Sequence, residues 1–132
     1  MTTITEDYVS FETAKLLKEK GFNDKLCHMW YNIRKDVGYY LSSVGVKNHL
    51  PAPTLQMAMK WLREMYNIFI VVEPHLYDYV NGRNASYVCS IWVGDNYYEN
   101  LTSTEFPSYE EAIEAALKYS LKNLIISILS VL

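Results

Sequence analysis

The residues that most often bind metals or act as nucleophiles are few in this sequence and widely spaced. Cys27 and Cys89 form no CxxC pair. His28 follows Cys27 on a predicted strand, so the two side chains point to opposite faces and do not share a metal unaided. His49 and His75 fall in predicted loops without an acidic or cysteine cluster beside them. A zinc site from the cysteines and two histidines is geometrically open, but two buried thiols in a reducing cytoplasm are the favoured interpretation.

The sequence contains no Gly-rich phosphate loop, no HExxH pair and no GxSxG turn. Glu110, Glu111 and Glu114 could in principle bind a cation. However, Ser108 and Glu111 have the spacing of a capping box, and acidic residues in a first turn complement the helix dipole. We therefore expect a helix start here. The sequence predicts no catalytic residue, no metal and no cofactor, and a protein that is not an enzyme.

The aromatic content is unusual, with twelve Tyr and three Trp among 132 residues. Several tyrosines form close pairs at predicted strand ends, where they either cover a thin core or contribute to an interface, as Tyr and Trp often do. One pair follows two basic residues. The predicted interaction surface consists of Arg34, Lys35, Tyr39, Tyr40, Tyr97 and Tyr98.

The distribution of charge leaves nucleic-acid binding as an alternative. The net charge is −3, which gives no general attraction to phosphate, but residues 26–66 carry five basic residues, including Lys47, against two acidic ones. The second half has the helix, three strands and helix of a double-stranded-RNA-binding domain, which holds phosphates with basic residues at the start of its second helix. Here that helix begins with Glu110 and Glu111, so we interpret the order as a generic α/β layer.

The strongest structural signal is a helix that leads directly into a strand. Thr54 is a suitable N-cap and Asn67 a suitable C-cap for the helix. Ile68 to Val72 then reads as a strand that is apolar on both faces and central in a sheet, and Pro74 ends it. The apolar stripe of the helix comprises Leu55, Ala58, Met59, Leu62, Met65 and Tyr66.

The other segments complete a single α+β domain over residues 1–132. We expect three helices on an antiparallel or mixed sheet, in the order α-β-β-α-β-β-β-α. The first helix follows Ser10 and runs from Phe11 to Lys20, with Gly21 in the left-handed C-cap position, and the last helix follows Ser108. The remaining predicted strands and loops are Leu26–Tyr31, Gly38–Leu41, the polar loop Ser42–Leu50, the loop Pro74–Asn84, the strand Tyr87–Val93, a turn at 94–96 and the strand Tyr97–Leu101.

The segment Leu124–Leu132 is apolar all round and too short to span a membrane. It is expected to lie either in the core of the same subunit or against another subunit. In the second case Leu124, Ile128 and Leu132 would mediate self-association.

Three segments carry a resemblance to known proteins in the same order: Val9–Phe22, Ala52–Ile68 and Ser108–Ala112. On these segments the chain resembles a family of small uncharacterised proteins of bacteriophages and prophages of gut bacteria. The resemblance implies a bacterial cytoplasmic setting and an accessory role, and it brings no activity, cofactor or catalytic residue. The N-terminus also lacks the pattern of a signal peptide. We expect a cytoplasmic protein of the bacterial host that binds an unknown protein partner and forms an oligomer.

Overall fold

The chain alternates helices with antiparallel strands, and the predicted α+β class is confirmed. The computed structural model describes residues 3–23, 29–31, 37–39, 50–79, 82–98 and 104–125, without the side chains of 37–39, 76–79, 82–84 and 98. Within these residues the predicted order of elements is found, with one further strand, β3, at the end of the predicted polar loop. The elements are α1 (Phe11–Glu19), β1 (Met29–Tyr31), β2 (Val37–Tyr39), β3 (Leu50–Pro51), α2 (Leu55–Tyr66), β4 (Ile68–Tyr79), β5 (Gly82–Val93), β6 (Asn96–Tyr98), α3 (Tyr109–Tyr119) and the π-helical turn η2 (Ser120–Leu124).

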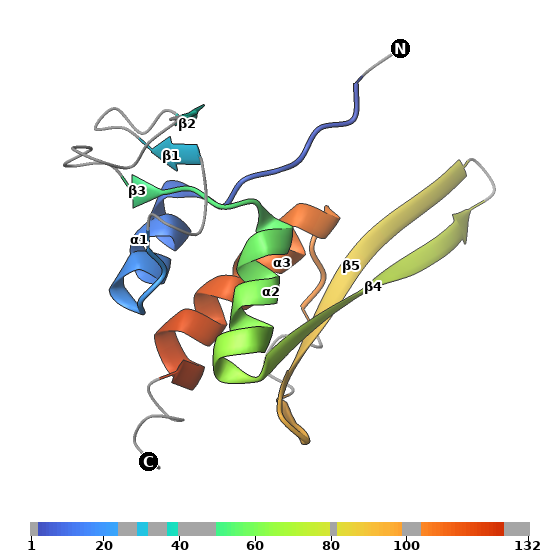
Figure 1. Cartoon of the computed structure of the whole chain (residues 1–132). Coiled ribbons are helices and arrows are strands. Elements are labelled where there is room, and N and C mark those ends of the chain that lie inside the picture. The colour runs from blue at the N-terminus through green and yellow to red at the C-terminus, as the bar shows by residue number, and fades with distance from the viewer. Residues whose placement is uncertain are drawn as a thin grey trace.

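The described strands form two antiparallel sheets, with the orders β2-β1-β3 and β4-β5-β6. The predicted antiparallel pairing is therefore confirmed, but it is divided between two sheets. Figure 1 shows α2 and α3 between them, with α1 and the small β1–β2–β3 sheet on one side and the long β4–β5 hairpin on the other. Both α2 and α3 pack on the hairpin.

The ends of the helices follow the predicted capping residues. Ser10, Thr54 and Ser108 each accept a hydrogen bond from the backbone N–H three residues later, at 3.1–3.2 Å, and so satisfy an otherwise unpaired donor. Asn67 ends α2 in the left-handed conformation with φ of 56°, which Asn tolerates better than most residues. Gly21 follows α1 with φ of 107°.

The core lies where the helices meet each other and the inner face of the hairpin. Leu17 of α1, Leu62 of α2 and Leu117 of α3 are completely buried, as is Ile68 at the start of β4. The stripe predicted on α2 is correct from Leu55 to Leu62. Met65 is an exception, because it is 62% exposed in the last turn of the helix.

The β4–β5 hairpin differs from the prediction at Pro74. The segment predicted as a loop from Pro74 to Asn84 belongs instead to two paired strands, with Pro74 opposite Tyr87. Tyr87 exchanges two backbone hydrogen bonds with Phe106, at 2.8 and 2.9 Å, so its backbone groups point away from β4. In an antiparallel pair, the backbone N of Pro74 must then point away from β5 as well. Pro74 therefore continues the strand, because its missing N–H lies on the other edge of β4.

The predicted central position of the strand Ile68–Val72 is wrong. β5 is central in its sheet, and β4 lies at an edge with no partner strand on its other side among the described residues. The composition of Ile68–Val72 is apolar on both faces, but only one of these faces is covered by helices.

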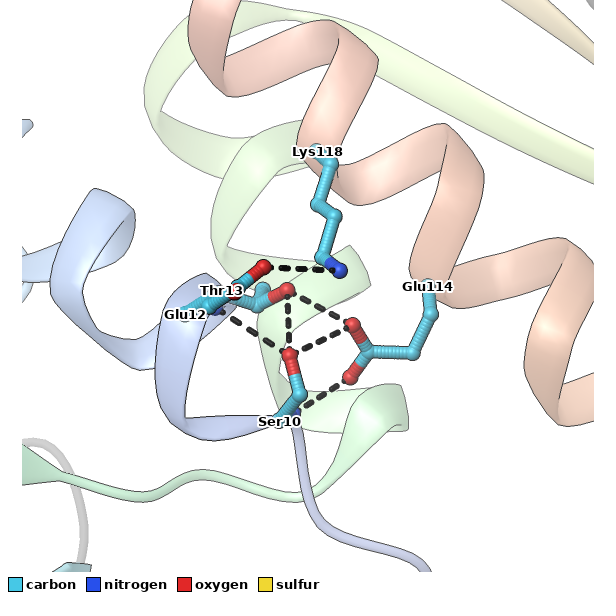
Figure 2. A network of polar contacts seen from close by, with 5 residues as sticks. All are labelled: Ser10, Glu12, Thr13, Glu114 and Lys118. Atoms are coloured by element: carbon cyan, nitrogen blue, oxygen red, sulfur yellow. Dashed lines mark hydrogen bonds and ion pairs between the residues drawn. The ribbon is translucent and has the colours of Figure 1, made fainter. Parts of the chain in front are cut away.

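A polar joint connects α1 to α3 across most of the sequence (Figure 2). The carboxylate of Glu114 accepts hydrogen bonds from Ser10 N at 2.5 Å, Ser10 Oγ at 3.1 Å and Thr13 Oγ1 at 2.6 Å. Thr13 is completely buried. The carboxylate thus satisfies donors at the N-terminus of α1 and places a negative charge at the positive end of its dipole. Beside it, Lys118 lies 3.4 Å from a carboxylate oxygen of the exposed Glu12.

Candidate interaction surface

The alternation of side chains in β4 and β5 gives the second sheet two different faces. The inner face contains Cys89 and Ile91, which are each 1% exposed. The opposite face, which we call the outer sheet face, is built from cross-strand pairs. These pairs are Phe69 with Trp92, Val71 with Ser90, Glu73 with Val88, and Trp92 with Tyr97 of β6.

The outer sheet face exposes large apolar side chains in a contiguous group. Phe69, Val71, Trp92 and Tyr97 are each 38–39% exposed. The rings of Trp92 and Tyr97 lie 4.8 Å apart between centroids with an interplanar angle of 53°. Single exposed apolar residues are normal on a protein surface, but a group of this kind on one face is typical of an interaction site. α2 and α3 lie on the other side of this sheet (Figure 1).

A cleft of about 410 Å³ runs over the outer sheet face. The Trp92–Tyr97 pair lines one part of it, while Glu73 contributes an exposed carboxylate. Glu73 has no ion-pair partner among the residues that the structure describes. The complete lining is Val71, Glu73, Val88, Cys89, Ser90, Trp92 and Tyr97. The cleft therefore combines an apolar floor, two aromatic rings and one negative charge.

The described residues of the interaction surface predicted from the sequence belong to both sheets. Tyr97 lies on the outer sheet face, and the backbone of Tyr98 continues β6. Tyr39 belongs to β2 in the other sheet, on the opposite side of α2 and α3 (Figure 1). Arg34, Lys35 and Tyr40 lie outside the described residues. Tyr39 and Tyr97 therefore belong to different sheets, and Tyr97, the one residue of the six whose side chain is described, lines the cleft.

The apolar tail is part of the core as far as the structure describes it. Leu124 is 3% exposed, and Leu121 and Ile125 beside it are fully buried. The side chain of Leu124 is already covered within this chain and is not available for the self-association predicted for it. Ile128 and Leu132 lie outside the described residues.

In the described part of the chain, the residues considered for metal binding or catalysis do not converge. Cys89 is buried, and its burial raises the pKa of the thiol to about 11, which makes it a poor nucleophile. His75 lies in β4, not in the predicted loop, and its Nδ1 is 3.3 Å from an oxygen of Glu105. Cys27, His28 and His49 lie outside the described residues. Within the described part of the chain, no three His, Cys, Asp or Glu side chains lie close enough together to hold a metal ion.

The acidic residues of α3 have separate roles near the start of the helix. The side chains of Ser108 and Glu111 lie 3.1 Å apart, and Ser108 Oγ accepts from Glu111 N, as the capping-box spacing predicts. Glu114 belongs instead to the joint with α1. The three carboxylates predicted as either a cation site or a helix start are thus not grouped around one point.

The exposure of Phe69 and Val71 was not predicted, because a strand of five apolar residues was expected to be buried on both sides. The alternation of Val88, Ser90 and Trp92 was the available signal, since it marks one face of β5 as distinct. Only the pairing register shows that Phe69, Val71 and Glu73 share that face.

Comparisons with known proteins identify no relative of this chain. No protein family model matches the chain, and neither a curated protein nor a solved structure is significantly similar to it. Among the described residues, none of the helices has the length and apolar character needed to cross a bilayer. The function is therefore inferred from the geometry of the outer sheet face.

Proposed function

We propose that this chain is a non-enzymatic interaction protein that binds another protein through the outer sheet face. The observation that carries the proposal is the group of four large apolar side chains, each more than a third exposed, beside a cleft. Aromatic residues such as Trp92 and Tyr97 contribute large contact areas and a polar atom when a partner covers them. An accessory role in a bacteriophage or prophage, in the bacterial cytoplasm, is part of the same proposal and is supported by the sequence resemblance.

The rigidity of the surface also supports binding. Phe69, Val71 and Trp92 project from paired strands whose inner face packs on helices, so their positions are fixed before a partner arrives. A preformed surface loses little conformational entropy on association. In contrast, nucleic-acid binding stays a prediction, because Arg34 and Lys35 lie outside the described residues.

The proposal is tested with a variant that removes the apolar character of the surface while keeping a strand-forming sequence. We suggest the double substitution Phe69→Thr and Trp92→Thr, because Thr is well tolerated in strands. The matched control is Met57→Gln with Met65→Gln, which removes two exposed apolar side chains from α2. Circular dichroism should show that both variants keep the fold.

Wild-type protein and both variants are immobilised and exposed to nuclease-treated bacterial lysate, and the bound proteins are quantified by mass spectrometry. We expect at least one lysate protein to bind wild type and the control in similar amounts. The amount of this protein bound by the Phe69/Trp92 variant should be at least tenfold lower. Light scattering of the purified proteins distinguishes binding of a second copy, which would appear as a change in mass. If neither captured proteins nor mass depended on Phe69 and Trp92, the outer sheet face would not be a binding site.

A further inference from the structure

We infer that the cleft on the outer sheet face recognises an extended segment of a partner protein that carries an arginine and, four residues away, a large apolar side chain. The inference rests on the proposed function, because it names the chemistry of the partner that the same surface binds. Three features of the cleft carry it: the spacing of its two ends, the carboxylate of Glu73, which has no ion-pair partner among the described residues, and the charges of the three strands that form the sheet.

The cleft has two chemically distinct ends at a defined spacing. The row of Glu73 and Val88 lies at one end, the row of Val71 and Ser90 follows, and Trp92 lies in the third row. Rows on one face of a sheet are two residues apart, or roughly 6.7 Å, so Glu73 and Trp92 are about 13 Å apart along the strands. Side chains four residues apart in an extended segment have the same spacing and point to the same side.

The end at Glu73 suits a guanidinium group. An arginine can lay its aliphatic stem along Val71 and place its planar head on the carboxylate in a bidentate pair. At the other end, the rings of Trp92 and Tyr97 offer a large apolar surface to an aliphatic or aromatic side chain. A single segment that lies along the strands would make both contacts.

The charges around the cleft favour a basic partner over the alternatives. The sequences of β4, β5 and β6 contain two acidic residues, Glu73 and Asp78, and one arginine, Arg83, which lies opposite Asp78 in the backbone register further along the hairpin. Glu73 would repel a phosphate backbone. A symmetric dimer built on this face would bring two copies of Glu73 into one interface without a basic residue among those that line the cleft. The carboxylate therefore selects against nucleic acid and against a second copy.

The probe for this inference is a displayed library of random twelve-residue peptides, selected on immobilised wild-type protein in low salt. Selected peptides are then measured against three proteins: Glu73→Gln, the Phe69→Thr/Trp92→Thr variant, and the Met57→Gln/Met65→Gln control. We expect arginine to be enriched together with a large apolar residue four positions away. Glu73→Gln should weaken binding about five- to tenfold, the size of one charge-assisted pair at a partly exposed site, and added salt should have a similar effect.

Two results would overturn the inference, and they separate it from the proposed function. Peptides that depend on Phe69 and Trp92 but lack a basic residue, or bind Glu73→Gln as tightly as wild type, would refute the arginine-recognising cleft and leave the interaction surface in place. Selected peptides that bind the Phe69/Trp92 variant as well as the control would refute both. Glu73→Gln keeps the size of the side chain, so it tests the charge without disturbing the strand.

Discussion

Substitution of Glu114 tests the joint between α1 and α3 most directly. Glu114→Ala removes the acceptor of three hydrogen bonds, from Ser10 N, Ser10 Oγ and Thr13 Oγ1. Hydrogen bonds to a charged group contribute about 1.5–3 kcal/mol each when buried, but this site is half-buried and water can replace the carboxylate at Ser10. Thr13 is fully buried, so its hydroxyl loses its best acceptor without access to water. We expect the free energy of unfolding to fall by about 2–3 kcal/mol.

Urea unfolding followed by tryptophan fluorescence measures this change. For a chain of this size, with an m-value of about 1.5–2 kcal/mol per M, the midpoint should fall by about 1–2 M. Glu114→Gln keeps one acceptor oxygen and should lose less than Glu114→Ala. Thr13→Val combined with Glu114→Gln closes a double-mutant cycle, whose coupling energy we expect to be about 1 kcal/mol.

The matched control is Glu110→Ala, in the first turn of the same helix. Glu110 is exposed, and its contribution is limited to the helix dipole, about 0.3–1 kcal/mol. If Glu114→Ala and Glu110→Ala had the same midpoint, the hydrogen bonds of Figure 2 would contribute nothing to stability. An additive double-mutant cycle would likewise refute the contact between Glu114 and Thr13.

Three further predictions concern single buried or edge residues. The thiol of Cys89, whose pKa burial raises to about 11, should not react with a disulfide reagent in the native state and should react once urea unfolds the chain. A colorimetric thiol assay on a Cys27→Ser variant, in which Cys89 is the remaining cysteine, can show this. Burial, with a smaller effect from Glu114, raises the pKa of Tyr31 above 10.0, so the native state holds this proton more tightly than the unfolded state. The contribution of Tyr31 to stability should therefore be complete below pH 10 and be lost as the pH rises further. In urea titrations, the free energy of unfolding should fall less steeply with alkaline pH for Tyr31→Phe than for wild type. Equal slopes would contradict the raised pKa of Tyr31. Pro74→Ala restores an N–H on the open edge of β4 and should increase concentration-dependent association in light scattering, whereas unchanged association would show that the edge is protected by other means.

The local structure of this protein is largely predictable from its sequence. Capping depends on residues within three or four positions of each other, so Ser10, Thr54, Asn67 and Ser108 could be identified without knowledge of the fold. The periodicity of α2 likewise identifies most of its buried side. These signals depend on residues close together in the sequence. The predictions based on them are correct where the local conformational preference agrees with the tertiary packing.

The features that could not be predicted depend on partners distant in the sequence. Proline usually ends a strand. Pro74 does not, because its position opposite Tyr87 turns its missing N–H away from β5. From the sequence, Glu114 is one more acidic residue near a helix start. Its hydrogen bond to Ser10 is known only once the packing of α1 against α3 is known. The exposure of the outer sheet face could not be predicted for the same reason. Composition alone does not show which side of an apolar strand the helices cover.

The joint at Glu114 also has a consequence for synthesis of the chain on the ribosome. Ser10 and Glu114 are 104 positions apart, so the hydrogen bonds between them form only after Glu114 has been synthesised. At about 5–20 residues per second, that interval lasts roughly 5–20 s. During this time the N-terminal end of α1 lacks three of its hydrogen bonds, and a nascent chain that stops before α3 cannot complete them.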